Sequence, residues 1–210
     1  MLWPDEHTLL IADFHLGKPA SFRKAGTPVP EEITHHDLSR LARLIEIHKP
    51  RRIAILGDLA HDRSAWAEVT MRTFVAWRRQ HDDVEMVLVR GNHDRRAADP
   101  PAELAITAVD PGWPLADIEL HHEPAATGPA PPILAGHLHP GVILRHPRRS
   151  STLRAPCFWF TPMQGVLPAF GSFTGCAIIQ PGADDRVIIV GESRVLPLAS
   201  RAPVPDSDAG

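Results

Sequence analysis

Three short apolar runs in the first half of the chain constrain its fold more than any other feature. They span residues 8–12, 53–56 and 84–89, a length that suits a buried strand better than a helix. Between them, residues 31–48 and 65–80 carry apolar side chains at helical spacing. The order of strand, helix, strand, helix and strand predicts a parallel sheet with crossover helices. We therefore expect an α/β fold.

The second half of the chain has a different pattern. No long helical pattern follows Gln80, and turns rich in proline and glycine separate short apolar runs. We expect this half to be mostly β-structure. The runs predicted to be strands are residues 118–122, 133–135, 157–160, 175–179 and 186–190.

Length and composition are typical of a globular protein with one domain, or at most two small ones. Hydrophobic residues make up 43% of the 210 residues and charged residues 22%. The 22 prolines exceed the average of about 5% and predict many stiff loops. Residues 17–30, with Gly26 and three prolines, are expected to form such a loop. We expect a single domain over residues 1–198 and a flexible polar tail over residues 199–210.

Charge, cysteine content and hydropathy narrow the class of protein further. The formal net charge of −3 argues against bulk electrostatic binding of nucleic acid, although it is compatible with a local basic patch. Two cysteines, Cys157 and Cys176, are too few for a disulfide framework and are expected to be reduced. We see no signal-peptide pattern and no apolar run of about 20 residues, so we expect a cytoplasmic protein without a membrane span. No pattern indicates the oligomeric state.

Histidine, aspartate and asparagine recur in five short segments, and the first three segments directly follow the predicted strands. Because the carboxyl ends of parallel strands lie at one edge of a sheet, we expect these segments to converge. Their oxygen and nitrogen ligands suffice for two metal ions, which suit in-line displacement at a phosphoryl centre. The segments are Asp13-Phe-His15, Gly57-Asp58-Leu-Ala-His61, Gly91-Asn92-His93-Asp94, His121-His122 and Gly136-His137-Leu-His139.

The spacing within these segments suggests how ligands are shared. In an extended segment, residues two apart point to the same side, so Asp13 and His15 can meet one ion. His137 and His139 repeat that spacing. Asp58, after a strand and a glycine, is the natural bridging carboxylate. Such mixed sites accept Mn, Fe, Zn or Ni with little discrimination.

The third segment adds the groups needed for proton transfer. The amide oxygen of Asn92 can bind a metal without adding charge. His93 is either a further ligand or a general acid, and Asp94 can hold the tautomer of that imidazole. In the fourth segment, alternation places His121 and His122 on opposite faces, and the pattern alone does not choose between them as ligand.

In this order, the motifs D-x-H, G-D, G-N-H-D, H and G-H-x-H resemble the calcineurin-like metallophosphoesterase superfamily. The resemblance implies a four-layer α/β/β/α sandwich of two mixed β-sheets. It implies that Asp58 bridges two metals and that His93, supported by Asp94, protonates the leaving oxygen. The resemblance also implies two ligand sets, Asp13, His15 and His139 for the first metal and Asn92, His122 and His137 for the second.

The residues around the motifs resemble a narrower group, the ligase-associated DNA damage response endonucleases (PdeM family). The resemblance implies manganese-dependent cleavage of single-stranded DNA, with a DNA ligase, a helicase and an exonuclease-like protein as repair partners. The form His-Glu-Pro at residues 122–124 favours His122 as the ligand. The other segments that carry the resemblance are residues 15–30, 90–95, 135–141, 156–159 and 167–175.

Basic and aromatic residues near the motifs bear on the substrate. The cations could hold backbone phosphates, or they could form an ordinary solvated face. His61 could reach the substrate or support a ligand. Phe22 and residues 158–160 could stack on bases but fit core or rim packing better. The cations are Lys18, Arg23 and Lys24 after the first motif and Arg90, Arg95 and Arg96 around the third.

The metal-ligand pattern alone leaves other functions open. The same two-metal centre would serve a small-molecule phosphodiesterase, such as one acting on cyclic nucleotides, or a phosphomonoesterase. A scaffold that kept the fold and lost catalysis is the least favoured alternative, because every predicted ligand and His93 are present.

Overall fold

The first half of the chain builds a five-stranded sheet in the order β1-β2-β3-β4-β5. The computed structural model describes residues 1–30, 32–125, 131–145, 151–192 and 194–198. Strand β1 is antiparallel to β2, and the other neighbours are parallel, as the strand and helix order predicts. The strands are β1 (Leu2–Trp3), β2 (Thr8–Ile11), β3 (Arg52–Leu56), β4 (Glu85–Val89) and β5 (Ile106–Val109).

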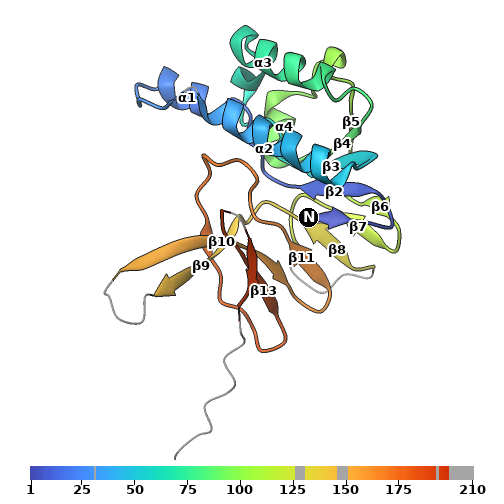
Figure 1. The fold of residues 1–210 in the computed structure, drawn as a ribbon, viewed down its shortest axis with the longest axis vertical. Coiled ribbons are helices and arrows are strands. Elements are labelled where there is room, and N and C mark those ends of the chain that lie inside the picture. The colour runs from blue at the N-terminus through green and yellow to red at the C-terminus, as the bar shows by residue number, and fades with distance from the viewer. Residues whose placement is uncertain (31, 126–130, 146–150, 193, 199–210) are drawn as a thin grey trace, which may run out of the picture.

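The helices lie together on one side of this sheet (Figure 1). Among the described residues, no helix is long and apolar enough to cross a membrane. The α-helices are α1 (Lys18–Lys24), α2 (Glu32–His48), α3 (Glu68–Arg79) and α4 (Asn92–Ala97), and two short 3-10 helices are η1 (Arg63–Trp66) and η2 (Ala102–Leu104).

Helix α1 was not expected, because residues 17–30 were predicted to be loop. Pro19 lies in its first turn, where the missing N–H costs no helical hydrogen bond. The Ser21 N–H donates to the Gly17 carbonyl at 2.9 Å and starts the helix. The second predicted helix is also shorter than expected, because η1 replaces its first turn.

The second half forms a nine-stranded mixed sheet, and each of its five predicted runs contains a strand. Seven strands follow the order β12-β9-β10-β11-β8-β7-β6, and β13 pairs with β10 and β14. The strands are β6 (Trp113–Leu115), β7 (Ile118–Leu120), β8 (Ile133–Ala135), β9 (Pro140–Arg145), β10 (Thr152–Phe160), β11 (Gln164–Val166), β12 (Ala177–Ile178), β13 (Arg186–Val190) and β14 (Val195–Pro197).

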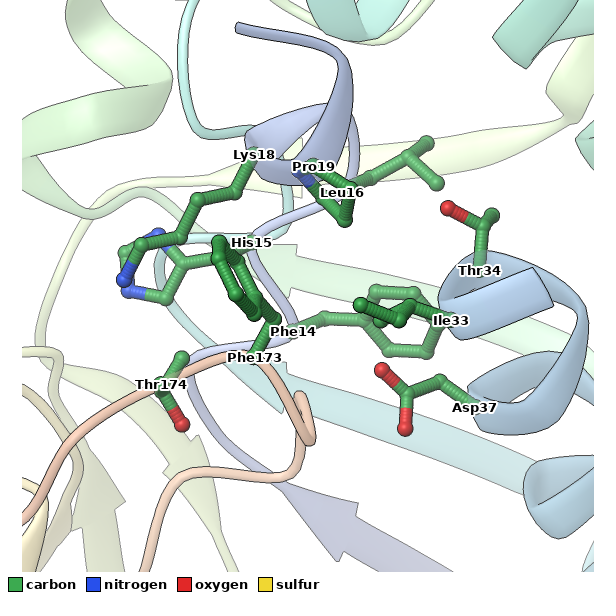
Figure 2. Close-up of a pocket in the computed structure, with 10 residues that line it drawn as sticks. All are labelled: Phe14, His15, Leu16, Lys18, Pro19, Ile33, Thr34, Asp37, Phe173 and Thr174. Carbon is green, nitrogen blue, oxygen red and sulfur yellow. The ribbon is translucent and has the colours of Figure 1, made fainter. Parts of the chain in front are cut away.

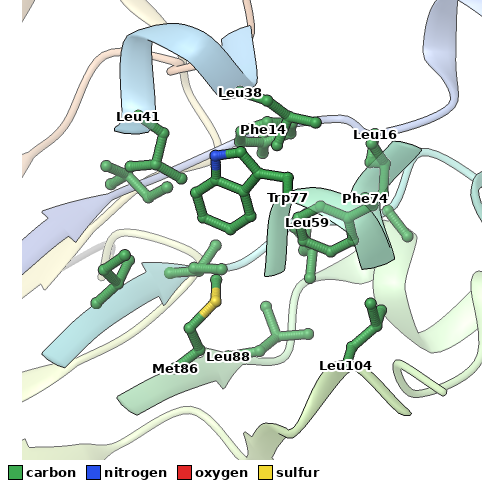
Figure 3. Close-up of a cluster of buried hydrophobic side chains, with 14 of the residues drawn as sticks. Phe14, Leu16, Leu38, Leu41, Leu59, Phe74, Trp77, Met86, Leu88 and Leu104 are labelled. Atoms are coloured by element: carbon green, nitrogen blue, oxygen red, sulfur yellow. The ribbon is translucent and has the colours of Figure 1, made fainter. Parts of the chain in front are cut away.

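The two sheets pack face to face because alternate residues of the inner strands point to opposite sides. Leu9 and Ile11 of β2 face the helices, in the core that also holds Phe74 and Trp77 of α3 (Figure 3). Leu10 faces the second sheet, in a core shared with residues such as Leu120 and Leu134. The fold is therefore an α/β sandwich of two mixed sheets.

One part of the predicted four-layer arrangement is not seen in the described residues. All described helices precede residue 105, and none covers the outer face of the nine-stranded sheet. The chain after Leu104 supplies strands and turns, so it has no helix to place there. The predicted tail, residues 199–210, lies outside the described residues.

Both cysteines are free, as expected. Cys157 is fully buried in a third core cluster, with Val142 and Val187 from neighbouring strands. Burial, with a smaller effect from Cys176, raises the pKa of the Cys157 thiol to about 11. A thiol in this setting is a poor nucleophile and acts as a core residue.

Candidate active site

The structure brings all seven predicted metal ligands together where the carboxyl ends of β2, β3 and β4 meet the second sheet. They contact one another in two groups. Their side chains are Asp13, His15, Asp58, Asn92, His122, His137 and His139.

The first group contains Asp13, His15 and His139, whose ligand atoms all lie within 4.8 Å of one another. The His139 Nε2 atom lies 3.3 Å from Asp13 Oδ1 and 3.4 Å from His15 Nε2. Asp13 is fully buried, and its Oδ2 accepts the His137 backbone N–H at 2.9 Å. Its Oδ1 accepts no hydrogen bond from the described residues. A buried carboxylate oxygen without a donor suits a metal ion.

The second group contains Asp58, His122 and His137, with Asn92 against it. The His122 Nε2 atom lies 3.4 Å from Asp58 Oδ2, 3.0 Å from Asn92 Oδ1 and 3.1 Å from His137 Nδ1. The other ring nitrogen, Nδ1, donates to the Leu56 carbonyl at 3.1 Å. Because a carbonyl only accepts, this contact directs the Nε2 lone pair into the group.

Asp58 lies between the two groups. Its Oδ1 accepts the His93 backbone N–H at 2.9 Å. Its Oδ2 lies 3.9 Å from His15 Nε2 and 3.4 Å from His122 Nε2. Burial, the largest cause, raises the pKa of Asp58, and the nearby Asp13 carboxylate adds to the shift. A buried negative charge in this position needs a positive partner such as a metal ion.

The structure separates the two adjacent histidines of the fourth motif. His122 is buried in the second group, whereas the half-exposed His121 ring pairs with Glu119 through Nε2 and Oε2 at 3.1 Å. Only His122 therefore lies among the candidate ligands.

His93 is held by a group that the sequence did not indicate. Its Nδ1 donates to the His61 backbone carbonyl at 2.6 Å, so Nε2 is the ring atom left for proton transfer. Asp94 does not support this ring, contrary to our prediction. Its buried carboxylate accepts the backbone N–H groups of Asp58, Ala60 and Gly91 at 2.7, 3.0 and 2.9 Å. Asp94 thus fixes the loops that carry Asp58 and His93.

His61 lies within the site as a neighbour of two other histidines. Its ring stacks on His93 with centroids 4.9 Å apart, and its Nδ1 lies 3.4 Å from His15 Nδ1. Burial lowers the pKa of His61, and nearby cationic groups lower it further. The three rings form a third group of possible ligand atoms within 4.8 Å.

The ligand-bearing segments have an unusual backbone. We expected residues 13–15 and 137–139 to be extended, but both histidine-containing pairs adopt positive φ. This left-handed region costs a non-glycine residue about 1–3 kcal/mol and is concentrated at functional sites. Tight turns, rather than strand alternation, therefore bring the ligands together. The φ angles are 53° for Asp13, 52° for His15, 52° for Asp58, 68° for His137 and 47° for His139.

The comparisons with known proteins agree with this geometry. The model of the calcineurin-like phosphoesterase family matches residues 7–148, which include all five motifs. The chain belongs to the calcineurin-like phosphoesterase family. The superfamily resemblance predicted from the sequence is thus confirmed.

Solved structures extend the comparison. The nuclease MPE of Pseudomonas putida is 44% identical with a TM-score of 0.80, and the match covers 93% of this chain and 90% of that chain. This similarity is consistent with a PdeM-like member of the family. Yfce, a phosphoesterase from E. coli, is a distant match at 12% identity and a TM-score of 0.39, covering 92% of this chain and 93% of that chain. A search of curated protein sequences found no match.

Calcineurin-like phosphoesterases use divalent metals, and the residues present fit such ions. The donors are imidazole nitrogens and carboxylate or amide oxygens, which suit divalent transition metals. Burial, followed by the charge of Lys18, lowers the pKa of His15 to about 2, so that ring is neutral and can donate a lone pair. Asp13 Oδ1, which is buried and accepts no hydrogen bond from the described residues, also indicates a metal ion.

Of the predicted phosphate-binding cations, Lys18 lies beside the candidate metal ligands. Figure 2 shows its side chain beside that of His15. Burial lowers the pKa of Lys18, while Asp13 and Asp58 oppose the shift. Arg90 instead pairs with Asp99 at 2.7 Å and Asp110 at 3.2 Å.

The remaining predicted cations and aromatic residues lie outside the ligand groups. Arg23 donates to the carbonyls of residues 29 and 30, and Arg95 is exposed on α4. Phe158 and Phe160 pack against the core between the sheets, as expected. Phe22 is more exposed than these two residues: its exposed fraction is 38%, and it packs edge to face on Phe173 with ring centroids 5.2 Å apart.

The loop at residues 170–174 forms one wall of the site. The five sequence motifs did not indicate it. Gly171 N–H donates to the Asp13 carbonyl at 3.1 Å, and Asp37 of α2 accepts the Ser172 N–H at 3.0 Å. Phe173 and Thr174 of this loop line a narrow pocket beside His15 (Figure 2). The family resemblance of residues 167–175 was the signal, but it assigned no role to them.

Two glycines let the backbone approach the ligands. Gly57 has a φ of +79°, and a Cβ built on it would lie 2.1 Å from His122 Nδ1. A Cβ on Gly91 would lie 2.2 Å from Asp58 Oδ1. Any larger residue at either position would therefore displace a candidate ligand.

We expect Gly57→Ala to destabilise the protein and displace His122. A left-handed alanine costs about 1–2 kcal/mol and overpacking about 1–3 kcal/mol, so the free energy of unfolding should fall by about 2–5 kcal/mol. Denaturant unfolding and metal analysis measure the two effects. Gly26→Ala is the matched control, because its φ is +88° and no described atom lies within 4 Å of the added Cβ. Equal losses in both variants would contradict the steric role of Gly57.

Proposed function

We propose that this protein is a dinuclear metal-dependent phosphodiesterase that cuts single-stranded DNA. The observation that carries the proposal is the position of Asp58 Oδ2, within 3.9 Å of ligand atoms from both groups. Two adjacent divalent ions suit displacement at phosphorus. Similarity to a nuclease over nearly the whole chain supports a nucleic-acid substrate.

In this proposal the ligands keep the roles that the resemblance implies. When bound, the metals supply Lewis acidity to the phosphate oxygens and lower the pKa of the attacking water. Asp58, whose Oδ2 lies between His15 and His122, would be a ligand shared by both ions. The set for one ion is Asp13, His15 and His139, and the set for the other is Asn92, His122 and His137.

The protein's own groups handle charge and protons around the phosphate. His93, with Nδ1–H held by the His61 carbonyl, gives a proton from Nε2 to the leaving oxygen. Lys18, which interacts electrostatically with Asp13 and Asp58, would place a positive charge beside a phosphate bound at this site. Asp94 acts as a positioning residue, because it ties down the backbone of Asp58 and of Gly91.

The finer parts of the proposal rest on the resemblance of the flanking segments to the PdeM family. They are manganese as the metal, a cytoplasmic location, and a DNA ligase, a helicase and an exonuclease-like protein as partners. We also propose that residues 1–198 form a single domain. Iron, zinc and nickel are the alternative metals, because the donor set selects weakly among them.

A strand-cleavage assay tests the substrate. We expect purified protein with manganese to convert a circular single strand to linear fragments, and a chelator to stop the reaction. The same preparation is assayed with p-nitrophenyl phosphate, a phosphomonoester, and with cyclic AMP, a cyclic diester. Parallel reactions with iron, zinc and nickel rank the metals. Turnover of either small ester beside an intact circle would overturn the DNA proposal in favour of a small-molecule hydrolase.

A further inference from the structure

An open groove lies next to the candidate active site, between α1, η1 and α4. Its volume is about 490 Å³, which is far larger than one phosphate ion and within the range of clefts that hold nucleotide-sized ligands. None of the seven candidate metal ligands lines it. The lining residues are Ser21, Lys24, Ala25, Asp62, Arg63, Ser64 and Arg96.

The groove carries an excess of positive charge. Lys24, Arg63 and Arg96 are exposed, and none of them makes an ion pair with the residues that the structure describes. Asp62 is the one acidic side chain in the lining. Three cations against one carboxylate leave two formal positive charges. The groove therefore attracts anions, although the whole chain has a net charge of −3.

Asp62 holds the groove in shape instead of pairing with its cations. One carboxylate oxygen accepts the Ser21 hydroxyl at 2.5 Å, and the other accepts the Ser64 N–H at 2.7 Å. The two serine hydroxyls lie 2.8 Å apart. These bonds join α1 to η1, so the walls that carry Lys24 and Arg63 are fixed relative to each other.

Each wall of the groove continues into the candidate active site. Asp62 directly follows His61, whose carbonyl holds His93, and Arg96 lies one turn after His93 on α4. Lys18, beside His15, and Lys24 lie on the same helix, about 9 Å apart along its axis. A strand bound at the metal centre would reach the groove without leaving the protein surface.

We propose that this groove binds the backbone phosphates of nucleotides next to the bond that is cut, through Lys24, Arg63 and Arg96. This inference rests on the proposed function. Exposed cations on long side chains recognise phosphate without reading bases, so the groove would favour a polymer over a small ester and be indifferent to sequence. Because these contacts do not involve the reacting phosphate, their loss should raise KM and leave kcat unchanged.

The test is the triple variant Lys24→Gln, Arg63→Gln and Arg96→Gln. We expect KM for a long single strand to rise at least about tenfold, with an unchanged kcat. The slope of log affinity against log salt should become shallower by about 2, since each lost phosphate contact removes about 0.7. Turnover of bis-p-nitrophenyl phosphate, a small diester, should not change. Strand affinity is measured by fluorescence anisotropy in chelator, so it does not depend on the metals.

A control variant separates local from general charge effects. Arg43→Gln, Arg72→Gln and Arg79→Gln remove three exposed arginines from α2 and α3 and change the net charge equally. If both triple variants have the same KM and salt slope for the strand, the groove proposal is wrong. The proposal is also wrong if the groove variant loses as much turnover of bis-p-nitrophenyl phosphate as it loses of strand cleavage. If the unmodified protein cuts no strand with any metal, the proposed function fails instead.

Discussion

An Asp58→Asn protein is expected to lose at least about a thousandfold in phosphodiester turnover. The amide can still accept the His93 N–H, which keeps the fold, but its NH2 group cannot bridge two ions between His15 and His122. The two metals contribute several kcal/mol to transition-state stabilisation, and each 1.36 kcal/mol corresponds to about tenfold in rate. Initial rates on the small diester and metal analysis of the purified protein measure the loss.

Thermal unfolding provides a second test of metal binding by the Asp58→Asn variant. Ligands that bind only the folded state raise the unfolding temperature, so manganese should stabilise the unmodified protein more than Asp58→Asn. Without metal, the variant should be at least as stable as the unmodified protein, because a buried charge close to Asp13 has been removed. Asp99→Asn, at an exposed carboxylate paired with Arg90, is the control. Two bound ions and full turnover in Asp58→Asn would refute the bridging role.

A His93→Ala protein is expected to keep its metals and lose about 10²–10⁴-fold in DNA cleavage, the usual contribution of general acid catalysis. The loss should depend on the leaving group. A deoxyribose oxygen needs a proton as it leaves, whereas p-nitrophenolate leaves readily without one. Rates on a DNA strand and on bis-p-nitrophenyl phosphate therefore separate general acid catalysis from metal binding.

The control for His93 is His36→Ala, at an exposed ring on α2. Metal content should be unchanged in both variants. An equal loss on both substrates would show that His93 acts by holding the site together and not by donating a proton. Cleavage of DNA at the full rate would show that another group is the acid.

The sequence predicted the inner strands, and it also predicted which polar side chains lie together beside them, because both depend on local patterns. Runs such as residues 53–56 are buried on both faces, and a strand with that environment is apolar throughout. The polar residues that follow such runs, among them Asp58, meet at one sheet edge whatever the loops do. The convergence of the first three motifs could therefore be predicted without knowing where the second sheet lies.

Contacts between distant segments were not predictable in this way. Asp94 was assigned to the neighbouring ring, but its carboxylate binds the backbone of Asp58 and Ala60, more than thirty residues earlier. The partner of His93 is a carbonyl, which every residue possesses, so no residue type marks it. Helix α1 was missed because proline and glycine are read as loop formers, although both are tolerated at a helix start.

The tie between Asp13 and His137 has a consequence for the timing of assembly. The Asp13 carboxylate accepts the His137 N–H, and His139 contacts both Asp13 and His15, across separations of 124 to 126 residues in the chain. A growing polypeptide therefore cannot complete the first ligand group until residue 139 has been synthesised and the later strands have docked. The centre therefore cannot act as a catalyst while the chain is still being synthesised, and it becomes complete only when both sheets have formed.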